Sequence, residues 1–205
     1  MSSVVLLFLV VVGYSGESIS IGKDTTPNLQ VYQRTLKLMG SRFDLTVVAE
    51  NQKQGDKYLD LAIAEISRIE KIISSWDPQS QTSAINRNAG VSPVKVDSEL
   101  FQLIERALKV SMLTQGAFDI SYASMDRIWK FDGSITEMPP VELIKQSVSK
   151  VGYQNIILNH KNQTVFLKNK GMKIGFGAIG KGYAADKAKE LLMKRGVTSG
   201  IINAS

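Results

Sequence analysis

The chain has 205 residues, 43% of them hydrophobic, which suits a single domain with a substantial core. The formal net charge is +6, but acidic residues interrupt the basic ones throughout, which indicates a solvated surface and argues against nucleic-acid binding. The sequence contains no Cys, so disulfides, thiolate metal sites, a Cys nucleophile and a lipid-anchored Cys are excluded.

The first 16 residues have the features of an export segment. Residues 1–13 are apolar over a length typical of a signal-peptide core and too short to span a bilayer, and the small residues after them suit a cleavage site. No Lys or Arg precedes the apolar run, and a buried N-terminal strand is therefore the alternative. We predict that residues 1–16 direct export to the periplasm or another extracytoplasmic face of the membrane, and that residues 17–30 form a polar linker.

Residues 31–205 form the predicted folded domain. Alternating side chains predict strands, apolar residues at helical spacing predict helices, and Asp97, Gly116 and Pro140 supply helix start and stop signals. The expected elements are a hairpin of residues 31–39 and 43–48, helices over 56–74, 98–115 and 140–152, a hairpin of 156–158 and 164–167, a helix from Ile179, and a strand over 200–203. These elements show no regular βαβ alternation, so the predicted fold class is α+β.

A glycine-rich stretch at residues 171–186 follows a short apolar run and leads into the last helix. Its glycines at positions 175, 177, 180 and 182 lack a Cβ, so the backbone can approach a ligand or turn sharply there. A helix that begins near Ile179 would aim free N–H groups and the positive end of its dipole at a phosphate. A glycine-lined turn that packs a helix on a strand is the alternative.

Two nucleotide-binding motifs match this stretch in spacing and fail in context. Gly175-x-Gly177-x-x-Gly180 matches the dinucleotide fingerprint, but no acidic residue follows about 20 positions later. Residues 175–181 match a P-loop up to its Lys, but Gly182 replaces the Ser or Thr that would bind Mg²⁺.

Residues 177–186, Gly-Ala-Ile-Gly-Lys-Gly-Tyr-Ala-Ala-Asp, resemble the signature of the ApbE family, the FAD:protein FMN transferases. Three further segments resemble family motifs in the same order along the chain. These segments are Leu38-Met39-Gly40-Ser41, the Ser-rich stretch 74–86 around Trp76, and Thr114-Gln-Gly-Ala-Phe-Asp119. The resemblance covers residues from about 36 to 205.

Each motif also has a purely structural interpretation. Asp77-Pro78 suits a turn with Trp76 as a core anchor, and Gly116 suits a helix C-cap followed by one buried Phe. His160 is the single His and lies in a polar turn, so we assign it no role.

The resemblance implies a set of site residues. Met39 and Trp76 would contact the flavin, and an indole suits stacking on its ring. The backbone of Ala117, Phe118 and Asp119 would line the FAD site, Lys181 would neutralise the diphosphate, and the carbonyl of Ala178 would bind Mg²⁺. Gly175 belongs to this cofactor-binding set by position, although the family often has Asp there.

The resemblance also implies the fold and the reaction. The fold is expected to be the T-fold-like mixture of sheet and helices of the family, incomplete at its C-terminus because strand 200–203 has no partner after it. The reaction would be Mg²⁺-dependent transfer of FMN from FAD to a Thr or Ser of an acceptor flavoprotein, such as a subunit of a membrane redox complex, with release of AMP. The catalytic residues are not identified in these 205 residues, and we expect no transferase activity from this chain alone.

Two other functions are compatible with the sequence. The first is an exported protein of the same fold that binds or hydrolyses FAD without transferring FMN. The second is a P-loop or Rossmann nucleotide-binding enzyme, which the departures at Gly182 and after the fingerprint disfavour.

Overall fold

The computed structural model describes residues 28–125, 128 and 137–204. The predicted export segment, residues 1–16, and most of the linker, residues 17–30, lie outside this part. Among the described residues, no helix has both the length and the apolar character needed to cross a membrane.

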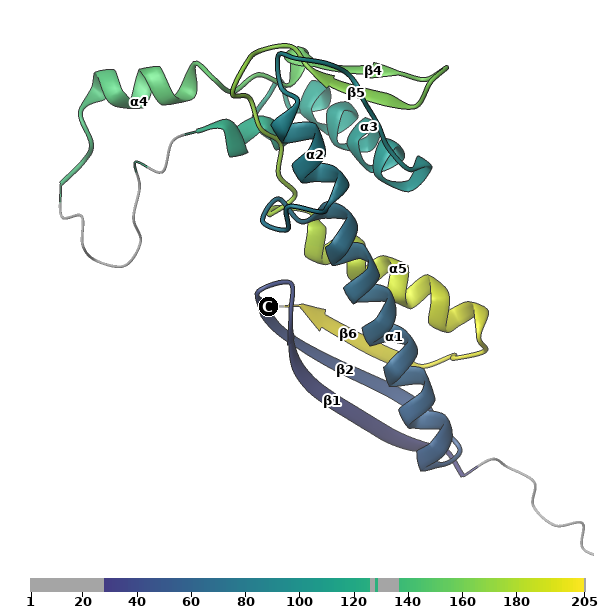
Figure 1. The fold of residues 1–205 in the computed structure, drawn as a ribbon. Helices are drawn as coiled ribbons and strands as arrows, with labels where there is room; N and C mark the ends of the chain where they lie inside the picture. The colour runs from purple at the N-terminus through teal and green to yellow at the C-terminus, as the bar shows by residue number, and fades with distance from the viewer. Residues whose placement is uncertain (1–27, 126–127, 129–136, 205) are drawn as a thin grey trace, which may run out of the picture.

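The chain forms two antiparallel three-stranded sheets joined by one long helix (Figure 1). The sheet orders are β1-β2-β6 and β3-β5-β4. The strands are β1 (Gln30–Leu38), β2 (Ser41–Ala49), β3 (Val94–Lys95), β4 (Ile156–Asn159), β5 (Thr164–Leu167) and β6 (Gly200–Ala204). The α-helices are α1 (Gln52–Ile73), α2 (Gln81–Arg87), α3 (Ser98–Leu113), α4 (Val141–Val148) and α5 (Gly180–Lys194), and two short 3-10 helices are η1 (Ile120–Ser124) and η2 (Tyr153–Asn155).

The first sheet contains the predicted N-terminal hairpin. Leu38 pairs with Ser41 across a two-residue loop, and β6 pairs with the other edge of β2, antiparallel to it. Helices α1 and α5 cover one face of this sheet (Figure 1). The alternation along β2 therefore buries Phe43, Leu45 and Val47 against the apolar stripes of the two helices.

Helix α1 begins four residues earlier than its apolar pattern predicts. The side chain of Asn51 caps it by accepting a hydrogen bond from the backbone N–H of Gln54, 3.0 Å away. Gly55 lies inside the helix because the ring of Tyr32 on β1 occupies the space that a Cβ would need. Gly55 is therefore a packing contact between α1 and β1.

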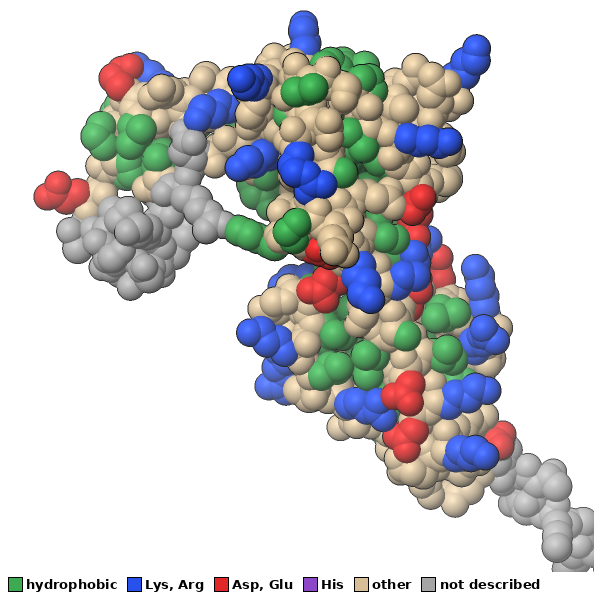
Figure 2. Space-filling view, viewed as in Figure 1, with side chains coloured by type: hydrophobic (Ala, Val, Ile, Leu, Met, Phe, Trp, Pro, Cys, Tyr) green, Lys and Arg blue, Asp and Glu red, His purple; other side chains and the backbone are tan. Residues whose placement is uncertain are grey.

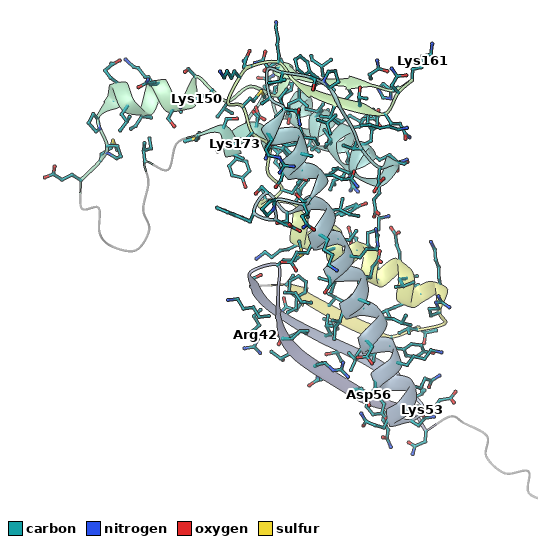
Figure 3. The ribbon with its side chains drawn as sticks, viewed as in Figure 1. Arg42, Lys53, Asp56, Lys150, Lys161 and Lys173 are labelled. Atoms are coloured by element: carbon teal, nitrogen blue, oxygen red, sulfur yellow. The ribbon has the colours of Figure 1, made fainter. Side chains whose placement is uncertain are left out.

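The second sheet, with α2 and α3, forms the other part of the molecule. In Figure 3, Lys53 and Asp56 mark the start of α1, near the bottom of the view beside the first sheet, and Lys161 marks the β4–β5 turn at the opposite end. Both predicted hairpins and the last strand are confirmed. Helix α4 ends at Val148, before the predicted end at Gly152.

Asp97 is the N-cap residue of α3, as predicted, but its carboxylate does not bond the helix. It accepts a hydrogen bond from the side chain of Gln81 instead, and the Gln81 amide oxygen accepts one from the Asp97 N–H at 2.7 Å. At the other end of α3, Gly116 has a φ of +87° and donates its N–H to the Ser111 carbonyl at 2.8 Å. This left-handed residue ends the helix, as predicted.

Candidate functional site

Residues 172–175 lead into the glycine segment and belong to no helix and to neither sheet. Side chains from α2 and η1 form hydrogen bonds with the backbone of residues 173 and 174. The Asn86 amide group donates to the Ile174 carbonyl at 3.0 Å and accepts from its N–H at 2.8 Å, and the Ser124 hydroxyl pairs with Lys173 in the same way at 2.9 and 2.8 Å. The N–H of Gly175 donates to the Ile120 carbonyl at 2.9 Å. Helices α2 and η1 therefore fix the path of the chain into the site.

The glycines of this segment are required by contacts with side chains. A Cβ on Gly177 would lie 2.5 Å from the Tyr122 hydroxyl oxygen, and one on Gly180 would lie 2.7 Å from Cδ1 of Ile73. A Cβ on Gly182 would meet nothing within 4 Å. Of these three glycines, Gly182 alone leaves open space beside the backbone.

A first hollow of about 400 Å³ lies on one side of residues 175–181. Three separate elements line it: the β1–β2 turn, the loop after α1 and the start of α5. Among its lining residues are Met39, Ser41, Trp76, Gly177, Gly180 and Lys181. The predicted flavin contacts and the predicted diphosphate-binding Lys therefore share one hollow.

The β1–β2 turn at this hollow has two unfavourable features. Met39 has a φ of +51°, a left-handed conformation that side chains other than those of Asn and Asp rarely adopt, and Gly40 follows at +77°. The Ser41 hydroxyl is the one buried side-chain polar atom that lacks a hydrogen-bond partner within the described part of the chain. Such features persist at binding sites, where the surroundings hold them in place. The Met39 side chain reaches across to Gly180, since its Cε lies 3.5 Å from the position of a Cβ there.

Trp76 lies on a loop that serine side chains hold in shape. The Ser74 hydroxyl accepts hydrogen bonds from the N–H groups of Trp76 and Asp77 at 3.2 and 3.0 Å, and the Ser80 hydroxyl donates back to the Ser74 carbonyl. Trp76 is 76% exposed, so it is not the core anchor of the structural interpretation. A rigid loop that presents an exposed indole beside a hollow is suited to bind a flat ring.

Lys181 lies in the first turn of α5. The N–H groups of Gly180 and Tyr183 donate to the carbonyls of Phe176 and Ile179, and those of Lys181 and Gly182 have no acceptor within the helix. Two residues after Lys181, the Tyr183 hydroxyl donates to a Glu99 carboxylate oxygen at 3.0 Å. Burial and the nearby Glu99 carboxylate raise the pKa of Tyr183 above its ordinary value. This bond holds the start of α5 against α3.

A second hollow, of about 320 Å³, lies on the other side of the glycine segment. Five of the predicted site residues line it: Ala117, Phe118, Asp119, Gly175 and Ala178. The structure thus divides the predicted residues between two adjacent hollows, with Gly177 and Lys181 on the first side and Gly175 and Ala178 on the second.

The Asp119 carboxylate organises the wall of the second hollow. One of its oxygens accepts hydrogen bonds from the N–H and the hydroxyl of Ser121, both at 2.7 Å. The other oxygen accepts from the N–H of Tyr153 at 2.8 Å. These bonds use both carboxylate oxygens to fix the loop, so Asp119 shapes the hollow through the backbone.

Among the described residues, no cluster of metal-ligating side chains accompanies the predicted Mg²⁺ ligand. The predicted ligand Ala178 is exposed and lines the second hollow, but no group of three or more His, Cys, Asp or Glu side chains gathers there or elsewhere in the described ranges. Mg²⁺ usually takes one or two carboxylates. The carboxylate nearest in sequence to this wall, Asp119, is held by the loop.

A larger groove, of about 570 Å³, runs between α5 and β6 and contains none of the predicted site residues. Asp186, the last residue of the glycine-rich signature, lines this groove. On the face in Figure 2, Lys and Arg side chains are spread over both parts of the molecule with Asp and Glu among them, and they form no continuous basic stripe.

The geometry excludes the P-loop and Rossmann alternatives. Both motifs need a β-strand that leads into the glycine loop, and the Rossmann fold needs parallel strands. Here residues 172–175 are in no strand, and the pairings in both sheets are antiparallel. The match of Gly175, Gly177 and Gly180 to those motifs is a coincidence of spacing.

The chain folds into an α+β domain with two hollows around the glycine-lined start of α5. The model of the ApbE family matches residues 39–205, and the chain belongs to this family. An FAD:protein FMN transferase from Klebsiella pneumoniae (strain 342) is 30% identical over 174 residues, which are 85% of this chain and 54% of that protein. A relative of the same name from Treponema pallidum (strain Nichols) is 29% identical over 139 residues, 65% of this chain and 38% of the relative.

Solved structures show the same fold. The crystal structure of an ApbE protein from Thermotoga maritima matches with a TM-score of 0.75 and 27% identity, over 85% of this chain and 57% of that one. The flavin transferase ApbE from Vibrio cholerae matches with a TM-score of 0.72 and 16% identity, over 85% of this chain and 57% of that one, which shows the fold alone. The chain spans about half the length of the curated relatives it matches.

Three residues that shape the site had no role in the sequence-based prediction. Asn86 and Ser124 clamp residues 173 and 174, and Tyr122 covers Gly177. Asn86 lies at the end of the Ser-rich family motif, residues 74–86, and its place there indicates a specific role for its amide side chain. Ser124 and Tyr122 have no comparable signal, since their partners lie about 50 positions away in the chain.

Proposed function

We propose that this chain provides the FAD-binding part of an Mg²⁺-dependent FAD:protein FMN transferase. The transferase would attach FMN from FAD to a Thr or Ser hydroxyl of an acceptor flavoprotein and release AMP. The observation that supports this proposal is the convergence of four separated sequence motifs on residues 175–181, with an exposed Trp76 and Lys181 beside the same hollow.

The reaction divides FAD at its diphosphate. The acceptor hydroxyl oxygen forms a bond to the phosphorus of the FMN half, and the bond from that phosphorus to the bridging oxygen breaks. AMP leaves with the bridging oxygen, and a base takes the proton of the hydroxyl. Because such a transition state carries its charge on phosphate oxygens, the enzyme acts mainly by positioning and by electrostatic stabilisation.

The described residues contribute binding and orientation to this reaction. Lys181 and the first turn of α5 offer a cation and N–H groups for the diphosphate, and Trp76 with Met39 offers apolar surface for the ring. Ala178 offers one carbonyl oxygen for Mg²⁺, which would take its other ligands from carboxylates, phosphate and water. No catalytic base is assigned.

We infer the place of the reaction from the predicted export segment and the acceptors from the resemblance to the family. An apolar segment of 13 residues at the N-terminus favours action at the periplasmic or another extracytoplasmic face of the membrane. The acceptors would then be subunits of membrane redox complexes or other exported flavoproteins.

The first test is calorimetric titration of the chain with FAD, with and without Mg²⁺, for the wild type and Trp76→Ala. Loss of the stacked indole should weaken FAD binding by about 10-fold. Met112→Ala, which removes an exposed apolar side chain from α3, is the matched control and should bind FAD like the wild type. A folded wild-type chain that binds no FAD would contradict the proposal that the pocket lies in these residues.

A second candidate is an FAD-binding or FAD-hydrolysing protein of the same fold without transferase activity. The absence of a carboxylate cluster among the described residues favours keeping it as an alternative. Release of AMP distinguishes the two functions, because a transferase needs an acceptor peptide for it and a hydrolase does not. We expect the 205-residue chain to bind FAD and to release no AMP by itself.

A further inference from the structure

Tyr122 lies where the two hollows meet. Its side chain is 44% exposed and lines the second hollow. Its hydroxyl oxygen lies 2.5 Å from the position of a Cβ on Gly177, which lines the first hollow, and 3.5 Å from that of a Cβ on Gly175. The hydroxyl therefore lies over the glycine backbone that separates the hollows.

The Tyr122 hydroxyl differs from those of three other tyrosines in the described part of the chain, which have hydrogen-bond acceptors. Tyr32, Tyr58 and Tyr183 donate to Gln30, to the Arg195 carbonyl and to Glu99 at 3.0, 3.5 and 3.0 Å. The Tyr122 hydroxyl has no hydrogen-bond partner among the described residues. Within the described part of the chain it is therefore a donor without an acceptor.

We propose that Tyr122 is a substrate-contacting residue whose hydroxyl donates a hydrogen bond to a phosphate oxygen of the bound dinucleotide. This inference rests on the proposed function. The phosphate is the favoured partner because Gly177, directly beneath the hydroxyl, is followed after three residues by Lys181 and the first turn of α5, which attract negative charge. A phenol hydroxyl facing an ionised oxygen forms a short, strong hydrogen bond.

The contact gives Gly177 a second reason to be glycine. An alanine Cβ there would lie 2.5 Å from the Tyr122 hydroxyl oxygen but 3.7 Å from its Cζ, which is an ordinary contact distance. Gly177→Ala would therefore displace the hydroxyl, and removal of the hydroxyl would relieve that conflict. The two positions should be coupled in ligand binding.

The test measures the affinity of the full chain for FAD and for riboflavin, which carries no phosphate, in the wild type and in Tyr122→Phe. The substitution keeps the ring that covers the glycines. We expect FAD binding to weaken about 10-fold, as for loss of a hydrogen bond to a charged group, and riboflavin binding to change less than about 2-fold. Tyr153→Phe, whose ring lies beside Gly116 but does not line either hollow, is the control and should change neither affinity.

Each other outcome overturns the inference. Unchanged FAD binding in Tyr122→Phe, with a wild type that binds, would show that Tyr122 only packs against the glycines. Equal weakening for FAD and riboflavin would place the hydroxyl on the flavin or ribityl part. A folded wild type that binds neither ligand would contradict the proposed function and this inference together.

The double substitution tests the geometry independently. Gly177→Ala should weaken FAD binding by about 10-fold in the wild type and by less than about 2-fold in Tyr122→Phe. Equal losses in both backgrounds would show that the alanine methyl group obstructs the ligand directly, and the proposed contact would be wrong.

Discussion

The two hollows on either side of residues 175–181 are built in different ways. In the first, side chains from three elements reach into the space, and two of its turn residues, Met39 and Ser41, are held in unfavourable states. In the second, the backbone of residues 116–119 forms the wall, and hydrogen bonds to Asp119 hold it. Substitutions of the side chains that reach into the first hollow should therefore alter binding more than stability, and substitution of Asp119, which holds the wall of the second, should alter stability first.

The largest expected effect comes from Asp119→Ala in the second hollow. The substitution removes three accepted hydrogen bonds and leaves the N–H groups of Ser121 and Tyr153 without partners. Unsatisfied buried donors of this kind cost about 1–3 kcal/mol each, so the free energy of unfolding should fall by about 2–3 kcal/mol. Urea unfolding followed by circular dichroism measures this change.

The matched control is Asp186→Ala, an exposed carboxylate on α5 that lines neither hollow. It should change stability by less than about 0.5 kcal/mol. If Asp119→Ala kept wild-type stability and lost FAD affinity alone, the carboxylate would act on the ligand, and the contrast between the hollows would fail.

The elements of this fold were predictable because their periodicity is local. Alternation along β2 and helical spacing along α1 follow from which face meets the core, and the structure confirms both elements. Helix α1 begins four residues before the predicted position, and Gly55 lies inside it where the ring of Tyr32 on β1 fills the space of a Cβ. Contacts between distant segments leave no local pattern in the sequence.

The candidate site was predictable as a set of residues and not as an arrangement. The resemblance to the family named residues that line the hollows, but it did not show that they divide between two of them. The clamp of Asn86 on Ile174 joins residues 88 positions apart, and the cover of Tyr122 on Gly177 joins separate segments. Neither can be found from spacing along the chain.

Met39→Asn tests the first hollow. An Asn-Gly pair suits a two-residue hairpin loop in which both φ angles are positive, so the substitution should relieve about 1 kcal/mol of backbone strain. The half-buried Met side chain is lost at the same time, which offsets much of the gain. We expect stability within about 0.5 kcal/mol of the wild type and FAD affinity about 5-fold weaker.

The control for this prediction is Gln163→Asn in the β4–β5 turn. Gln163 also has a φ of +51°, and it is exposed and lines neither hollow. It should gain about 0.5–1 kcal/mol in stability and keep the affinity of the wild type. Equal affinities for Met39→Asn and the wild type would mean that the strained turn does not serve the ligand.

The smallest expected effect concerns a charged cluster that joins α1, α3 and α5. Arg68 on α1 donates to Glu65 at 2.7 Å and to Glu99 on α3 at 2.6 Å, and Tyr183 on α5 donates to Glu99 at 3.0 Å. The hydrogen bond from Arg68 lowers the pKa of Glu99 below its ordinary value of 4.5. Glu99→Gln keeps an oxygen that accepts hydrogen bonds and removes the charge.

The sign of the pH dependence follows from that lowered pKa. The folded state favours ionised Glu99, so the stabilisation is complete above pH 4.5 and is lost as the pH falls through the lower folded pKa. Glu99→Gln should therefore cost about 0.5–1 kcal/mol at pH 7, the range for a largely solvated pair, and almost nothing in strong acid. Thermal unfolding between pH 7 and about pH 3 measures this difference, with Glu142→Gln on α4 as the control.

The same variant decides how independent the two hollows are. If Glu99 joins α1, α3 and α5 only for stability, Glu99→Gln should leave FAD affinity unchanged at pH 7, where the variant is still folded. A loss of affinity that exceeds about 3-fold would show that the position of Lys181 on α5 depends on Tyr183 and Glu99. Ligand binding in the first hollow would then depend on the hydrogen bonds that position α5, as the wall of the second hollow depends on those of Asp119. The two hollows would then differ only in degree.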